Sequence, residues 1–250
     1  MSLSVFITGG TSGIGLAMAQ AYLDRGATVG ICSRSLDKVS DFNHKNLYKY
    51  EADVTEKVAM EITILEYFSE HGLDYMVASA GIGYAKKKKI PDFDQSRQIY
   101  EVNVVGVLNV FEPAMKIMLK QKSGKLIAIS SLAAFNGLPG VSAYSASKAA
   151  VKQLCESFAI DLKDQGIGVT CIAPGFIDTP LTRRNHHPMP FLMDSDKAAK
   201  LILRAIDKNK VLYAFPFILS NVVRLLSFLP RGLYTRIMTR DSMNYSLKEK

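Results

Sequence analysis

Short runs of apolar residues alternate along this chain with longer stretches in which apolar residues recur every three or four positions. The short runs are rich in β-branched residues, which is typical of strands buried on both faces of a parallel sheet. They predict strands at residues 5–8, 28–33, 75–79, 125–130, 169–172 and 211–215, with a less regular candidate at residues 47–52. The longer stretches predict helices at residues 14–25, 58–70, 93–119, 143–163 and 196–208.

The order of these elements predicts an α/β fold. Strand and helix alternate throughout, as in a three-layer Rossmann fold, whose doubly wound and mainly parallel sheet of about seven strands carries helices on both faces. A length of 250 residues alone would also allow two small domains. Because no proline- or serine-rich linker divides the chain, we expect residues 1–250 to form a single domain.

Composition indicates a folded chain with an anionic partner. Of the residues, 48% are hydrophobic and 22% charged, which excludes a disordered polypeptide. Lysine and arginine number 31 against 23 aspartates and glutamates, a net charge of +8. Such a charge suits nucleic acid, a membrane surface or a phosphorylated ligand, and does not choose among them.

Cysteine usage and the absence of a targeting pattern bear on the compartment. Cys32, Cys155 and Cys171 lie far apart in apolar stretches, so we expect buried free thiols in a reducing compartment. The start of the chain lacks the pattern of a signal peptide, and no uninterrupted apolar run reaches about 18 residues. A cytoplasmic protein is therefore expected, with a reservation about the C-terminal segment.

A glycine-rich loop follows the first predicted strand. It reads Gly9-Gly10-Thr11-Ser12-Gly13-Ile14-Gly15, and a helical pattern begins at once. A strand, a tight turn and a helix N-terminus present backbone N–H groups to a pyrophosphate, and side chains in the turn would hold the phosphates away. The loop therefore predicts a dinucleotide site formed by Gly9, Thr11, Ser12, Gly13, Ile14 and Gly15.

The spacing T-G-x-x-x-G-I-G resembles that of the short-chain dehydrogenase/reductase family, and further motifs of the family follow in order. They are Asp53-Val54, Ala80-Gly81, Asn103, Ser130-Ser131, the Tyr-x-x-x-Lys pair Tyr144 and Lys148, Pro174-Gly175 and Thr179. The matches cover residues 8–179. One departure is Ala78-Ser79-Ala80-Gly81, where the family has Asn-Asn-Ala-Gly, so the contacts that brace the central strand are missing or come from Ser79.

The resemblance implies a catalytic set of four residues. Tyr144 would exchange a proton with the substrate, Ser131 would hold the substrate oxygen, and Lys148 would bond the nicotinamide ribose. Asn103 would kink a helix and hold a water in a relay through Lys148. The implied cofactor contacts, beyond the loop, Tyr144 and Lys148, are Asp53, Val54, Ala80, Gly81, Pro174, Gly175, Ile177 and Thr179.

The residues themselves support parts of this assignment. Tyr144 and Lys148 are four apart, which places both side chains on one face of a helix, and an ammonium there would lower the pKa of the phenol. Ser131 follows the strand at residues 125–130 and faces the crevice where open α/β sheets bind ligands. Strand alternation turns the neighbouring Ser130 away.

The end of the second strand predicts the type of nicotinamide cofactor. An NAD site places a carboxylate there for the ribose hydroxyls, but this chain reads Ile31-Cys32-Ser33-Arg34-Ser35. Ser33 can donate to a 2′-phosphate and the Arg34 guanidinium can pair with it. We therefore expect NADP(H) to be preferred over NAD(H), with Arg34 as a solvated loop residue being the alternative.

Three further segments are not explained by these motifs. Residues 180–200 correspond to the flexible substrate lid of the family. The run Lys86–Lys89 and the pair His186-His187 are expected in loops, and the histidines have no carboxylate at ligand spacing, so no metal site is predicted.

Residues 216–250 form an amphipathic C-terminal extension. Ile218, Val222, Leu225 and Leu229 recur at helical spacing with arginines among them. This stripe could cover the substrate pocket or a subunit interface, or it could lie on an anionic membrane surface. We favour the cover or interface, since most apolar helical stripes are buried.

Together these features predict an NADP(H)-dependent oxidoreductase that moves a hydride between nicotinamide and a carbonyl or alcohol substrate. Alternatives are a regulator that binds NADP without turnover and a membrane-surface reductase of a lipophilic ketone. A nucleic-acid binder ranks last, because no zinc finger, RNA-binding motif or continuous basic helix is present. The resemblance also implies a homodimer or homotetramer.

Overall fold

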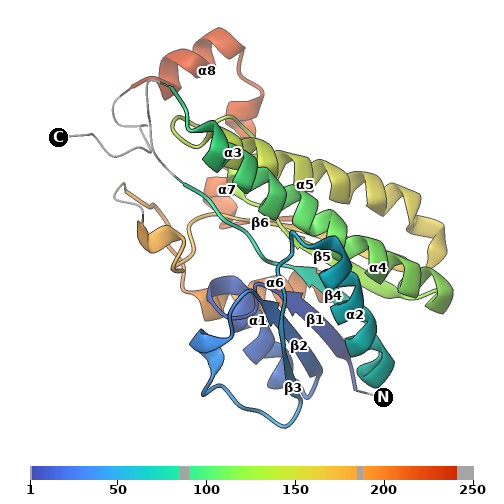
Figure 1. Ribbon diagram of the computed structural model, residues 1–250. Coiled ribbons are helices and arrows are strands. Elements are labelled where there is room, and N and C mark those ends of the chain that lie inside the picture. The colour runs from blue at the N-terminus through green and yellow to red at the C-terminus, as the bar shows by residue number, and fades with distance from the viewer. Residues whose placement is uncertain (1, 85–89, 185–187, 241–250) are drawn as a thin grey trace.

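The computed structural model describes residues 2–84, 90–184 and 188–240 and has a parallel sheet at its centre (Figure 1). The strands are all parallel in the order β3-β2-β1-β4-β5-β6-β7, so the predicted doubly wound α/β fold is confirmed. The bounds of the strands are β1 Ser4–Thr8, β2 Thr28–Ser33, β3 Leu47–Glu51, β4 Tyr75–Ala78, β5 Gly124–Ile129, β6 Ile167–Pro174 and β7 Leu212–Phe215.

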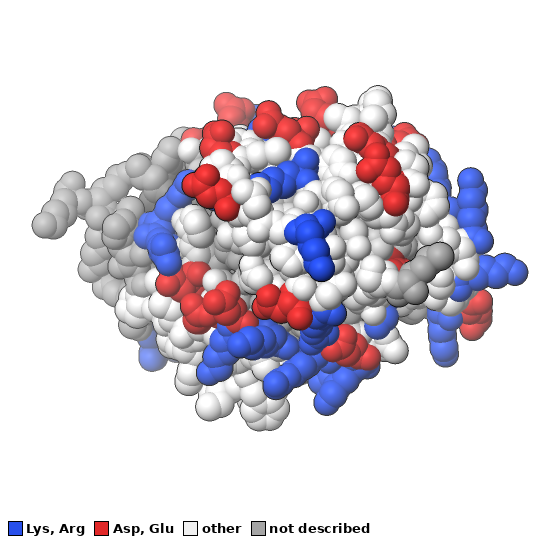
Figure 2. All heavy atoms as spheres, turned by 90° about the horizontal axis from the view of Figure 1, so that it is seen from below, with Lys and Arg blue, Asp and Glu red and all other residues white. Residues whose placement is uncertain are grey.

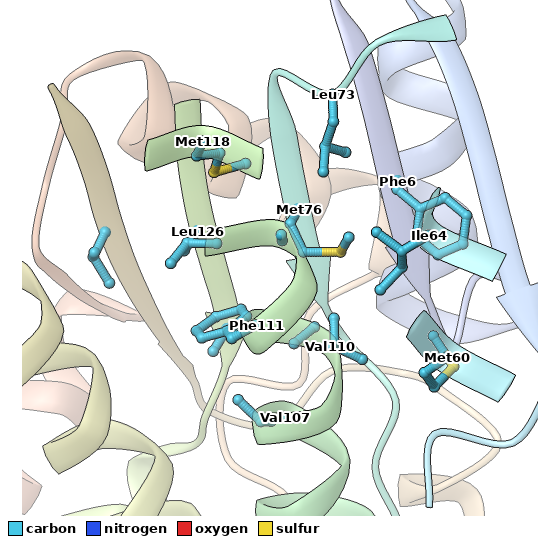
Figure 3. Packing of buried hydrophobic residues seen from close by; sticks show 14 of the residues in the cluster. Phe6, Met60, Ile64, Leu73, Met76, Val107, Val110, Phe111, Met118 and Leu126 are labelled. Carbon is cyan, nitrogen blue, oxygen red and sulfur yellow. The ribbon is translucent and has the colours of Figure 1, made fainter. Parts of the chain in front are cut away.

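Helices cover both faces of the sheet because the strands are apolar on both sides. One apolar cluster joins the sheet to α1 (Gly13–Leu23) and α6 (Ser195–Asp207). A second cluster joins the opposite face to α2 (Lys57–His71), α4 (Gly106–Gln121) and α5 (Ser142–Asp161). Figure 3 shows this second layer, where buried side chains of α2 and α4 meet those of the strands. Burial of these surfaces is the main stabilising contribution to the fold.

The predicted helix at residues 93–119 is interrupted. The structure has α3 (Phe93–Tyr100), a π-helical turn at Glu101–Val105, and then α4. The buried side chain of Asn103 lies in the turn, accepts a hydrogen bond from Ile82 N (2.8 Å) and donates one to Ile82 O (3.0 Å). The wider turn aims this amide at the chain that follows β4. The apolar spacing continues through the turn, so the pattern did not reveal it.

In the described residues, the continuous stretch 93–121 is the one helical segment long and apolar enough to cross a membrane. However, 61% of its apolar window is buried inside the molecule, in the core layer formed with α2 and α5. A core helix of a globular domain meets the same criteria of length and composition.

The C-terminal stripe forms two helices instead of one, α7 (Phe217–Ser227) and α8 (Arg231–Met238). Pro230 stands immediately before α8, where its missing N–H breaks no helical hydrogen bond. In Figure 1, α8 lies at the end of the molecule opposite the N-terminus. Residues 241–250 of the predicted extension lie outside the described residues.

The three cysteines are buried and free, as predicted. Cys155 of α5 and Cys171 of β6 are distant in sequence but lie close enough in space that Cys171, together with burial, raises the pKa of the Cys155 thiol. A hydrogen bond braces the central strands, where Ala80 N donates to Thr8 Oγ1 (3.4 Å). A threonine of β1 therefore makes a bracing contact of the kind expected from Ser79, whose side chain lines the cleft described next.

Candidate active site

A cleft lies beyond the carboxyl ends of the strands, where the chain order reverses between β1 and β4. Open α/β sheets bind ligands at such switch points. The cleft is lined by every residue predicted from the motifs to contact a dinucleotide, namely Gly9, Thr11, Ser12, Gly13, Ile14, Gly15, Ser33, Arg34, Asp53, Val54, Ala80, Gly81, Tyr144, Lys148, Pro174, Gly175, Ile177 and Thr179.

The glycine loop forms a cradle that larger residues would fill. Gly9 and Gly13 have φ values of +67° and +53°, a backbone conformation that side chains disfavour. A Cβ on Gly9 would lie 2.8 Å from Ala80 Cα, and one on Gly13 would lie 2.9 Å from Thr179 Cγ2. Helix α1 begins at Gly13 with no cap from the side chain of Ser12. Its first N–H groups are thus available to a phosphate, and the cradle fits a dinucleotide pyrophosphate.

The end of β2 carries cations and hydroxyls. Ser33 accepts a hydrogen bond from Thr11 (Oγ–Oγ 3.1 Å), and the side chain of Arg34 is 62% exposed, with its Nε 3.9 Å from Asp53 Oδ2. Lys38, which the sequence reasoning missed, also lines the cleft. Its signal in the sequence was a second cation four residues after Arg34.

Tyr144 and Lys148 lie on one face of α5, as their spacing predicted. The buried ammonium of Lys148 donates to Ile129 O (2.8 Å) and lies 5.8 Å from the centroid of the Tyr144 ring. The half-buried phenol of Tyr144 lines the cleft together with Ser131, which follows β5 and whose hydroxyl acts to lower the pKa of the phenol. Ser131 Oγ also accepts from Ala133 N (3.1 Å), and this bond holds the serine at the start of the next turn.

The electrostatics of this pair correct one expectation. Burial raises the pKa of Tyr144, and the hydroxyl of Ser131 lowers it only in part. Burial also lowers the pKa of Lys148 to about 8. The prediction that the neighbouring ammonium brings the pKa of the phenol down was wrong, because burial of Tyr144 raises that pKa and dominates.

Asn103 does not line the cleft but lies behind it. A Cβ on Gly81 would come within 3.2 Å of Lys148 Nζ and 3.3 Å of Asn103 Oδ1, so both side chains border the same point of the chain. Asn103 Nδ2 also lies 3.0 Å from Ser147 Oγ on α5. Ser130 also borders the cleft, contrary to the expectation that it is turned away, but its buried hydroxyl donates to Lys148 O (2.8 Å).

An apolar chamber opens from the cleft beside Tyr144 and Ser131. No charged side chain is among the described residues that form it. Its apolar lining comes from the segment after β5, from the segment after β6 and from α7, in the form of Leu132, Ala133, Leu138, Val141, Phe176, Leu181, Leu219 and Val223. Sequence reasoning named none of these residues, although it considered the C-terminal stripe as a cover for a pocket.

Some of the predicted segments lie partly or wholly outside the residues that the structure describes. Leu181, Thr182 and Arg184, at the start of the predicted lid 180–200, line the cleft. Lys86–Lys89 and His186-His187 lie outside the described residues. Across residues 2–84, 90–184 and 188–240, no group of three or more histidine, cysteine, aspartate or glutamate side chains could hold a metal ion.

Comparison with known proteins identifies the family. The family model for short chain dehydrogenases matches residues 4–189. An uncharacterized oxidoreductase of Myxococcus xanthus is 34% identical over 238 residues, covering 92% of this chain and 94% of that protein. The chain therefore belongs to the short-chain dehydrogenase/reductase family and is an oxidoreductase that acts on a small-molecule substrate.

Solved structures agree with this fold. A short chain dehydrogenase from Burkholderia cenocepacia, in complex with NADP, superposes with a TM-score of 0.85 at 23% identity, covering 96% of this chain and 98% of that chain. The structure of ElxO with NADP bound has a TM-score of 0.78 at 26% identity, with coverages of 86% and 97%.

Proposed function

We propose that the protein is an NADP(H)-dependent oxidoreductase that reduces a carbonyl group or oxidises the corresponding alcohol. The observation that carries this proposal is the position of Tyr144 and Ser131, two hydroxyl-bearing residues that line both the cleft and the apolar chamber. A carbonyl compound in the chamber would reach both hydroxyls from one side and the dinucleotide cleft from the other.

The chain supplies binding and proton transfer in this reaction. A nicotinamide held in the cleft would supply the hydride for the carbonyl carbon, or take one up from the alcohol carbon. In the reductive direction, Tyr144 Oη donates its proton to the carbonyl oxygen, while the Ser131 hydroxyl hydrogen-bonds the same oxygen as it gains negative charge. The raised pKa of Tyr144 keeps the phenol protonated at neutral pH, as a proton donor must be. The oxidative direction reverses both transfers.

Lys148 and Asn103 would act behind these hydroxyls. The ammonium of Lys148 faces the cleft from α5 and is suited to bond the hydroxyls of a ribose. Asn103 fixes the chain at Ile82, directly after Gly81, and so shapes the wall beside Lys148. A water between Asn103 and Lys148 would complete a proton path from Tyr144 to solvent, as the family resemblance implies.

The proposal predicts that removing the hydroxyl oxygen of Tyr144 slows turnover strongly. Tyr144→Phe should lower kcat about 10²–10⁴-fold, the usual contribution of a general acid, while NADPH binding changes little. The rate of NADPH oxidation with aldehydes and ketones measures kcat, and fluorescence titration measures NADPH binding. Tyr100→Phe, at an exposed tyrosine of α3, is the matched control.

Two outcomes would contradict the proposed chemistry. Full activity of Tyr144→Phe would remove the tyrosine from the mechanism. Tight NADPH binding by the parent protein with no turnover of any carbonyl or alcohol tested would favour the alternative of a cofactor-binding regulator.

The preference for NADP(H) is supported by the cations at the end of β2. Arg34 and Lys38 line the cleft, and no acid stands in β2 at the position of the usual ribose-binding carboxylate. A 2′-phosphate would pair with these cations, whereas NADH offers no such charge. Arg34→Asp should therefore weaken NADPH binding at least tenfold and leave NADH binding unchanged or tighter.

Calorimetric titration of both dinucleotides tests this preference, with Lys45→Asp in an exposed loop as the control for added negative charge. Tighter binding of NADH than NADPH by the parent protein would overturn it. Equal loss of both cofactors in Arg34→Asp would indicate a structural defect instead.

The lining of the chamber supports an apolar substrate. Leu138, Phe176, Leu219 and Val223 offer no partner for a charged group, and burying an unpaired charge there would be strongly unfavourable. We therefore expect uncharged lipophilic ketones or aldehydes and their alcohols. A homodimer or homotetramer stays a prediction from the family resemblance, which light scattering can check.

A further inference from the structure

Helix α7 has two apolar faces, of which one packs against the molecule and lines the chamber and the other is exposed. Leu219 and Val223 point to the chamber, and Ser220 between them is buried. On the other side, Phe217 is 79% exposed, Leu225 69% and Phe228, directly after the helix, 84%. We call this surface the outer face, which also includes the exposed residues Ile218 and Val222.

The outer face belongs to a segment with cations and no acids. Residues 216–240 contain four arginines and not one aspartate or glutamate, and the following ten residues add two acids and two lysines. Arg231, Arg236 and Arg240 are exposed on and directly after α8. By contrast, Figure 2 shows the underside of the molecule in Figure 1, away from α8, with basic and acidic side chains interspersed. The acid-free segment is therefore a local feature.

Contacts with the body of the molecule hold both helices in place. Asn136 Nδ2 donates to Val223 O (2.9 Å), and the hydroxyl of Tyr234 donates to Gly137 O (2.6 Å). The guanidinium of Arg224 lies 5.5 Å from the centroid of the Phe135 ring. Because these bonds and the chamber fix the inner side of α7, the outer face cannot turn inward to bury its apolar residues.

The charge of the segment decides between two occupants. A second copy seated symmetrically on this face would bring arginines against arginines, with no acid of residues 216–240 to pair with them. An anionic phospholipid surface offers phosphates to the arginines and an acyl boundary to the phenylalanines and leucine. Helix α7 has 11 residues, too few to span a bilayer, for which about 20 are needed.

We infer that the outer face of α7, with the arginines of α8, binds the surface of a membrane that contains anionic phospholipid. Phe217, Leu225 and Phe228 enter the interface between headgroups and acyl chains, and Arg231 and Arg236 contact the phosphates. The inner face of the same helix then places the chamber next to the bilayer. This binding requires neither cofactor nor substrate, so it stands apart from the proposed function.

Co-sedimentation of the full-length protein with vesicles tests the inference. We expect binding to phosphatidylcholine vesicles that contain phosphatidylglycerol, little binding to pure phosphatidylcholine, and loss of binding at high salt, where charges are screened within about 3 Å. A basic residue near an anionic surface contributes about fivefold in affinity. Arg231→Gln with Arg236→Gln should therefore weaken binding about 25-fold, and Phe217→Ser with Leu225→Ser and Phe228→Ser should abolish it.

Matched controls change the same chemistry elsewhere. Val58→Ser with Ile62→Ser and Leu65→Ser removes three exposed apolar residues from α2, and Lys120→Gln with Lys163→Gln removes two exposed cations; both should bind vesicles like the parent. Since every altered side chain is exposed, thermal unfolding should confirm that all variants fold.

Three results would overturn the inference. One is equal binding to zwitterionic and anionic vesicles. Another is equal loss of binding in the control and outer-face variants. The third is no binding of the parent protein to anionic vesicles; self-association that the outer-face variants abolish, measured by sedimentation velocity, would then show that a second copy occupies this face.

Discussion

Lys148 is a buried cation that meets a carbonyl oxygen and an aromatic ring. Its ammonium donates to Ile129 O, and in the described part of the chain no carboxylate forms an ion pair with it. Burial accordingly lowers the pKa of this amine to about 8. The cleft therefore contains a charge whose burial weakens the fold, an arrangement common where a residue is kept for function.

Removing this charge should stabilise the protein. The pKa of Lys148 is about 8 in the folded state and 10.5 for a free lysine side chain, so the unfolded chain binds more protons between these pH values. The contribution of Lys148 to stability therefore rises from pH 8 to pH 10.5. Below pH 8, Lys148→Met should raise the free energy of unfolding by about 1–3 kcal/mol, while turnover falls sharply.

Urea unfolding at pH 7 and pH 10 measures the difference between the two proteins, which should shrink at the higher pH. Lys152→Met, one turn along α5, removes a lysine paired with Glu156 and should not stabilise the fold. A less stable Lys148→Met at pH 7 would show that the bond to Ile129 outweighs the burial of the charge.

At the scale of single elements, the apolar pattern of the sequence predicted some features of the fold and missed others. The strands at the centre of the sheet were predicted because burial on both faces leaves a continuous apolar run, whereas the edge strand β3 (LYKYE), none of whose residues is fully buried, was a less regular candidate. The break between α3 and α4 was not, since Asn103 bonds the backbone of Ile82, 21 residues earlier, while the apolar spacing runs on. The resemblance to a family, rather than periodicity, indicated a kink there.

The residues of the candidate site also fall into those that the sequence predicted and those that it did not. Residues proposed to bind a dinucleotide through backbone geometry or charge, such as Gly13 and Arg34, belong to motifs that could be recognised in the sequence. The chamber depends on the packing of α7 against the turn after β5, so Leu219 and Val223 could not be separated from their exposed neighbours. The pKa of Tyr144 also depended on burial, which no spacing reveals.

Substitutions on the two faces of helix α7 should differ in their effect on catalysis. Leu219→Trp fills part of the chamber and should raise KM for bulky lipophilic ketones at least tenfold, with a smaller effect on short aldehydes. Leu225→Trp, on the outer face, should leave the kinetics in vesicle-free solution unchanged. Steady-state rates over a series of ketones of increasing size measure both, and equal effects of the two variants would exclude α7 as a wall of the substrate site.

At the scale of the whole molecule, the net charge of +8 is unevenly placed. Part of it lies in residues 216–240, which carry four arginines and no acid. Another part lines the cleft, where the described charged residues are Arg34, Lys38, Lys148, Arg184 and a single acid, Asp53. In both groups the cations outnumber the nearby carboxylates, which favours two separate anionic partners, a dinucleotide and a lipid surface.

The cations of the cleft also bear on how fast a dinucleotide arrives. Three exposed positive side chains around one opening, those of Arg34, Lys38 and Arg184, should attract a phosphorylated molecule before contact and raise the frequency of productive encounters. Stopped-flow association of NADPH should therefore slow steeply with ionic strength, whereas dissociation should change less; a salt-independent association rate would contradict this. If the association rate falls in this way, the capture speed of the proposed cofactor, as well as its affinity, would depend on Arg34, Lys38 and Arg184.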